Sequence, residues 1–182
     1  MRLWADVFDA NGTKLAQIDA LISANTSDKL DQAGTFDMQC ALDEAVIDYL
    51  TTGNEIAVYM AEDDETPLEL TRGTITKPRI QESGDNLTIS ISGRDEINEL
   101  NFRTVGLGRS YQAQPVQTIL SDLVELVPGW TASVDEADAA RLQTARFDGA
   151  KVLRAVSESV KQLGLHFRKG TTSRTLEIGA FG

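Results

Sequence analysis

The chain has 182 residues, of which 17 are Lys or Arg and 28 are Asp or Glu, so its formal net charge is −11. Hydrophobic residues make up 41% of the chain and charged residues 25%, which is typical of a folded domain and excludes a disordered chain. One Cys and one His exclude an internal disulfide, a cysteine-based zinc site and a multi-histidine metal site. An acidic chain also lacks the excess of Lys and Arg that binds nucleic-acid phosphates.

The sequence contains no run of roughly 18 apolar residues, the length that a membrane-spanning helix requires. The N-terminal stretch reaches a charged residue at Asp6, too early for the apolar segment of a secretory signal. We therefore expect a protein that is made in the cytosol without export.

Strand patterns fill the first half of the chain. Asn11-Gly12 lies between the apolar runs 3–8 and 14–22 and predicts a type I′ hairpin. Residues 25–34 are polar and predict a loop, and 36–42 alternates apolar with polar residues, as a half-buried strand does. With further strands around 56–60, 68–80 and 86–92, five or six antiparallel strands are enough for a small β-barrel or sandwich.

Helical patterns appear around these strands and dominate the second half. Asp43 predicts the N-cap of a short helix over 44–50. After a glycine-containing loop over 101–110, apolar residues recur with helical spacing over 114–127. Asp148 predicts the cap of a second amphipathic helix that ends at Gly164, and a terminal hairpin follows over 165–178. We expect an α+β, mainly β protein with a β-barrel-like domain over 1–100 and a mixed module over 108–182.

No pattern in the sequence indicates catalysis or a cofactor. His166 lies in a predicted strand without a nucleophile motif, and Cys40 shares the apolar face of its strand, so we expect a surface histidine and a buried thiol. The carboxylates of 62–65 predict a solvated hairpin tip. A pair of carboxylates could still serve a glycan hydrolase, although no local signature marks one. We therefore expect no catalytic, cofactor-binding or metal-binding residues.

Several segments, in this order and spacing, resemble the tail hub proteins of bacteriophages, also called baseplate hub proteins. They are Ala33-Gly34-Thr35-Phe36, Gly53-Asn54-Glu55-Ile56-Ala57-Val58, Thr71-Arg72-Gly73-Thr74-Ile75, Ser92-Gly93-Arg94-Asp95, Arg146-Phe147-Asp148-Gly149 and Gly164-Leu165-His166-Phe167-Arg168. The resemblance covers the chain from about residue 30 to its end. Hubs of this family are usually longer, so we expect the chain to correspond to the N-terminal part of one.

This resemblance implies a structural protein without catalysis in this region. Three subunits, each with two β-rich domains, would form a ring that joins the tail tube to the tip or baseplate in the virion tail. The ring would contact other tail proteins and let DNA pass through its lumen without specific binding. The protein would be made in the bacterial cytoplasm without a signal peptide.

The connector after residue 100 is the candidate subunit interface. Phe102, Val105 and Leu107 are apolar residues in a glycine-containing segment where a monomer usually carries polar groups. They could equally fold back onto their own domain. Three other functions remain open. They are a distal tail or tube protein, a carbohydrate-binding or host-recognition module of a tail tip and, less favoured, a glycan hydrolase with two carboxylates.

Overall fold

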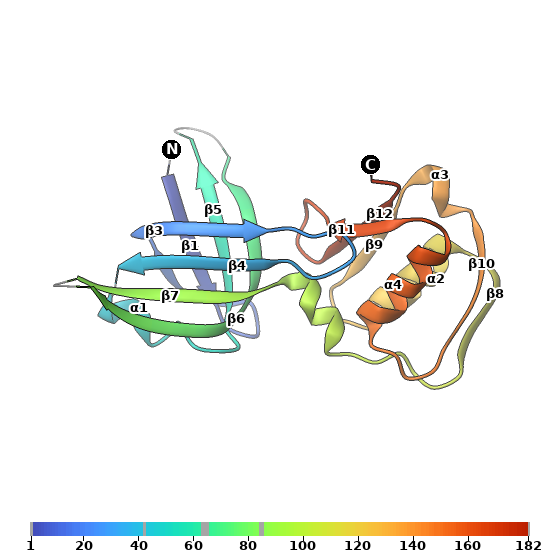
Figure 1. Ribbon diagram of the computed structural model, residues 1–182, viewed down its shortest axis with the longest axis horizontal. Coiled ribbons are helices and arrows are strands. Elements are labelled where there is room, and N and C mark those ends of the chain that lie inside the picture. Colours follow the sequence, from blue (N-terminus) through green and yellow to red (C-terminus); the bar gives the residue numbers. More distant parts are fainter. Residues whose placement is uncertain (1, 42, 63–65, 84–85, 182) are drawn as a thin grey trace. The chain divides into compact units, whose positions relative to one another are not determined.

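The computed structural model describes residues 2–41, 43–62, 66–83 and 86–181, and it is mainly β, as the sequence predicted. The chain divides into two compact units (Figure 1). The first unit comprises 1–27 and 34–96, and the second comprises 28–33 and 97–182. Within the described ranges, none of the helices has the length and apolar character needed to cross a bilayer.

The first unit is built on one antiparallel sheet, with strand order β2-β1-β5-β6-β7-β4-β3 in the described residues. Its elements in chain order are β1 (Arg2–Phe8), β2 (Lys14–Ile18), β3 (Leu21–Ser27), β4 (Thr35–Ala41), α1 (Glu44–Ile47), β5 (Glu55–Ala61), β6 (Leu68–Ser83) and β7 (Asn86–Asp95). The order is open, since no described pairing joins the outer strands β2 and β3. Within the described residues, the sheet is therefore an open form of the expected β-barrel-like domain.

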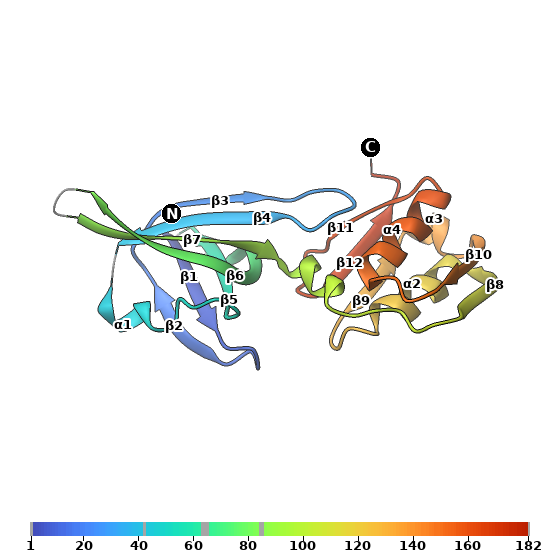
Figure 2. The ribbon, with the colours of Figure 1, turned by 60° about the horizontal axis from the view of Figure 1, so that its bottom comes forward.

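One face of this sheet forms the core of the first unit, because alternate residues of each strand point to the same side. Phe36, Ile56 and Ile91 are among its buried side chains, and α1 adds Val46. The long strand β6 curves, so that β1 and β5 cross the direction of β3, β4 and β7 in both views (Figures 1 and 2). The apolar faces of the two halves of the sheet can therefore meet in one core.

The second unit packs two helices and short strands around its own core. Its elements are η1 (Glu96–Asn101), β8 (Arg109–Pro115), α2 (Val116–Val124), β9 (Thr131–Val134), α3 (Glu136–Ala139), β10 (Leu142–Phe147), α4 (Val152–Gln162), β11 (His166–Lys169) and β12 (Thr175–Gly179). The described strands pair as β10-β8 and as β11-β12-β9. Trp130 and Phe167 are buried in the core together with the apolar faces of α2 and α4.

The segment 28–33 follows β3 but belongs to the second unit by its contacts. The backbone N–H of Asp31 donates to the carbonyl of Phe167 at 2.9 Å, and the Phe167 N–H donates to Asp31 Oδ1 at 3.0 Å. Asp31 has φ of 62°, a conformation that Asp adopts more readily than most residues. The unit boundary at residue 96 also places Ile97 and Leu100 in the second core, a few residues before the expected junction.

Residues 25–27, which the sequence predicted to lie in a loop, belong to β3. Two further local predictions were wrong. The turn at Asn11-Gly12 is not type I′, because among its described residues only Gly12 has a positive φ and the Asp9 side chain accepts from the N–H groups of Asn11 and Thr13. Asp148 does not cap a helix either. Helix α4 begins after Lys151, and the Asp148 carboxylate accepts instead from the Gly108 N–H at 2.8 Å. In both places a side-chain hydrogen bond to a nearby loop replaced the expected geometry.

Candidate interaction surface

The connector that the sequence marked as an interface splits into buried and exposed parts. Val105 is buried, and its N–H donates to the Ala150 carbonyl at 2.8 Å, so its side chain belongs to the core of the second unit. Phe102 and Leu107 remain 69% and 87% exposed. The candidate interface is therefore reduced to these two side chains.

The exposed position of Leu107 is held by an anchored turn. Gly108 has φ of +69° and donates its N–H to Asp148, which also pairs with Arg146 at 3.0 Å. The hydrogen bond from Gly108 lowers the pKa of the Asp148 carboxyl. A large apolar side chain on a fixed turn loses little conformational freedom on contact, which favours an interface.

The cysteine occupies the buried position that its strand predicted, whereas the histidine is half-buried rather than at an open surface. Cys40 is buried, and burial raises the pKa of its thiol, which disfavours the reactive thiolate. His166 is half-buried, and its Nδ1 lies 2.7 Å from Asp31 Oδ2, a contact between segments 135 residues apart that sequence reasoning missed. The described residues contain no group of three or more His, Cys, Asp or Glu side chains arranged for a metal ion. Residues 63–65 of the predicted acidic tip lie outside the described residues.

A carbohydrate-binding site would need exposed aromatic side chains that stack on sugar rings, and one of the two tryptophans of the chain is not exposed. Trp130 is fully buried, and its Nε1–H donates to Glu99 Oε2 at 2.9 Å. Arg174 donates to both oxygens of the Glu99 carboxylate, from Nε to Oε2 and from Nη2 to Oε1, each at 3.1 Å. Trp130 is thus a core residue held by a partly buried ion pair and cannot stack on a sugar ring.

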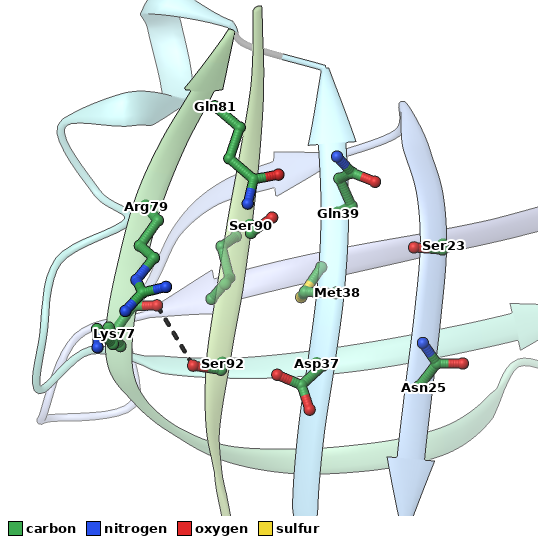
Figure 3. Close-up of a pocket in the computed structure, with 11 residues that line it drawn as sticks. Ser23, Asn25, Asp37, Met38, Gln39, Lys77, Arg79, Gln81, Ser90 and Ser92 are labelled. Carbon is green, nitrogen blue, oxygen red and sulfur yellow. Dashed lines mark hydrogen bonds between the residues drawn. The ribbon is translucent and has the colours of Figure 1, made fainter. Parts of the chain in front are cut away.

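The first unit carries a polar hollow of about 370 Å³ on the sheet face opposite its core (Figure 3). Four neighbouring strands, β6, β7, β4 and β3, line it with alternate residues. Cross-strand register places Lys77, Ser92, Asp37 and Asn25 in one row and Arg79, Ser90, Gln39 and Ser23 in the next. The only sequence signal for this site is the polar residue at every second position of each strand, and that pattern is typical of any solvent-facing sheet surface.

No family model and no curated protein matches the chain. Solved structures with a similar fold include a tail protein from Neisseria meningitidis, with a TM-score of 0.70 and 18% identity over 98% of this chain and 51% of that chain. The 43 kDa tail protein of prophage MuSo2 from Shewanella oneidensis has a TM-score of 0.68 and 18% identity, over 98% and 52% of the two chains.

A third similar structure is the Escherichia coli c3393 protein, a type VI secretion component described as similar to the bacteriophage T4 tail proteins gp27 and gp5. It has a TM-score of 0.54 and 15% identity, over 97% of this chain and 45% of that chain. The chain spans about half the length of these structures. It therefore has the fold of prophage tail proteins, which confirms the resemblance at the level of the fold.

Proposed function

We propose that this chain is a structural component of a phage or prophage tail and forms part of the hub ring that joins the tail tube to the tip or baseplate. The observation that carries the proposal is the likeness to the Neisseria and Shewanella tail proteins, which extends over 98% of this chain. A likeness confined to one unit would fit a common β-module used in many functions. Because the likeness covers both units, it favours a tail protein over a single shared module.

Two features of the chain support assembly through repeated subunits. The sheet of the first unit leaves β2 and β3 as outer strands, and unpaired strand edges readily join another chain. The second unit exposes Phe102 and Leu107 beside an anchored turn. We propose a trimer ring that uses these edges and side chains and contacts other tail proteins.

Deletion of the gene from the phage or prophage tests this function. We expect induced cells without the gene to accumulate heads and unfinished tails in electron micrographs, and a plasmid copy of the gene to restore complete tails. A copy with Phe102→Ser and Leu107→Ser should restore fewer complete tails than the wild type, because it removes the exposed apolar contacts. Normal, infectious particles from the deletion strain would contradict a structural role in the tail.

A further inference from the structure

The net negative charge of the chain lies entirely in one unit. The first unit contains 6 Lys and Arg against 17 Asp and Glu, a net charge of −11, whereas the second contains 11 of each and is neutral. The first unit thus contains almost three carboxylates for each Lys or Arg. Every cation there could therefore find a partner within its own unit.

Only half of those cations do so among the described residues. Arg2 pairs with Asp19 at 2.6 Å and Lys14 with Asp6 at 2.8 Å. Arg72 binds Glu69 at 3.0 Å on the half of the sheet made by β1, β5 and the start of β6. The described residues offer no ion pair to the other three cations, Lys77, Arg79 and Arg94.

These three cations share one face of the sheet. Register places Arg94 beside Thr35, two positions along β4 from Asp37, on the side that carries the hollow. Lys77 and Arg79 stand on β6 at one border of the hollow, as Figure 3 shows. Asp37 is the sole carboxylate in the lining and has no hydrogen-bond partner in the described part of the chain. The hollow is therefore a basic patch in an otherwise acidic unit.

We propose that this face binds an extended acidic segment of a partner polypeptide. Lys77 and Arg79 would bind its carboxylates, while Asp37 would accept a backbone N–H. The four strands span roughly 14 Å at about 4.8 Å per gap, the reach of four to five extended residues. The amide groups of Asn25 and Gln39 both donate and accept hydrogen bonds, which matches the peptide groups of such a segment.

The same features disfavour nucleic acid and free anions as the occupant. Asp37 lies in the same cross-strand row as Lys77 and requires a hydrogen-bond donor, which the N–H groups of a peptide backbone supply and a phosphodiester backbone does not. A small anion would use the two cations and leave the amide and carboxylate positions of β4 and β3 without a role. A polypeptide uses both sets of groups.

Fluorescence anisotropy with a labelled decapeptide of alternating Glu and Ser tests the proposal, and a Gln-Ser decapeptide serves as the uncharged control. We expect the Glu-Ser peptide to bind, added salt to weaken it, and Lys77→Gln with Arg79→Gln to reduce affinity by about tenfold or more, because charge-assisted hydrogen bonds are lost. The matched variant Lys151→Gln with Lys161→Gln removes the same charge from exposed positions of the second unit and should change affinity less than about twofold. Circular dichroism on both variants checks that the fold is intact.

Three results would overturn the proposal. Equal binding by the wild type and the Lys77/Arg79 variant would show that the hollow is not the site. Displacement of the Glu-Ser peptide by inorganic phosphate at the same concentration would assign the site to small anions. Self-association of the wild type that the Lys77/Arg79 variant abolishes would assign the face to a second copy of this chain.

Discussion

The two units of this chain differ most in their net charge. The first unit carries all of the net charge and exposes a polar face across four strands, whereas the second is neutral. Both units bury polar groups, such as Asp95 in the first and Gln143 with Ser159 in the second. Excess charge keeps a surface soluble and selects its partners, but it adds little to a fold. Buried and satisfied polar groups fix one packing arrangement in each unit. The difference in charge therefore concerns which partners each unit contacts rather than how either unit folds.

Separate cores predict separate responses to core mutations, and this is the largest effect we expect. Trp130→Ala should cost about 3–5 kcal/mol, because it opens a cavity in the second core and removes one of the hydrogen-bond donors to Glu99. Ile91→Ala should cost about 2–5 kcal/mol in the first core. Segment-resolved hydrogen exchange should accelerate within 97–182 for the former and within 34–96 for the latter. Equal acceleration in both units by either variant would show that they form one cooperative core.

The polar network of the second unit predicts the next largest effect. Glu99→Gln removes the charge that pairs with Arg174 but keeps an acceptor for the Trp130 N–H, so we expect a loss of about 1–3 kcal/mol. Urea denaturation of the second unit measures it. Glu125→Gln, at an exposed position of the same unit, should stay within about 0.5 kcal/mol. Equal urea midpoints for Glu99→Gln and Glu125→Gln would show that the hydrogen bonds of Glu99 do not stabilise the second unit.

A smaller effect is expected where the segment 28–33 joins the second unit. Asp31→Asn keeps a residue that tolerates a positive φ but replaces the carboxylate that faces His166 and the Phe167 N–H, at a cost of about 1 kcal/mol. The exchange rate of the Phe167 amide should rise while that of Ile91 stays unchanged. An unchanged rate at Phe167 would mean that the backbone bond to Asp31 alone holds this segment.

The smallest effect concerns the turn that presents Leu107. The hydrogen bond from Gly108 lowers the pKa of Asp148, so its contribution to stability is full above the unfolded carboxyl pKa of about 3.9 and is lost as the pH falls through the lower folded value. Asp148→Asn should therefore have a lower urea midpoint than the wild type near pH 7, and this difference should shrink toward about pH 3. A difference that is independent of pH would contradict a role for the charge.

The sequence predicted the elements that rest on regular periodicity. The alternation around Phe36 gave β4, the helical spacing from Val116 gave α2, and Asp43 caps α1 by accepting from the Ala45 N–H. Strands β8 and β10 escaped prediction, because β8 buries Tyr111 alone and the buried face of β10 includes the polar Gln143 beside Ala145 and Phe147, so neither sequence alternates apolar with polar residues. Local periodicity cannot reveal such strand pairings, since they depend on contact with distant segments.

The candidate surfaces show the same limit. The apolar character of the connector predicted an interface, but its sequence could not tell that Val105 turns inward while Leu107 turns outward. The basic face of the first unit was not predicted at all. Its rows join residues from four strands, for example Asn25 with Lys77, and only the register of the sheet brings them together.

Light scattering on the complete gene product that contains this chain tests the proposed tail ring most directly. At micromolar concentration we predict a mass of three subunits, and Phe102→Ser with Leu107→Ser should shift the protein toward the monomer. Leu142→Ser, another exposed apolar residue of the second unit, should leave the trimer intact. A monodisperse monomer at high concentration would contradict the ring.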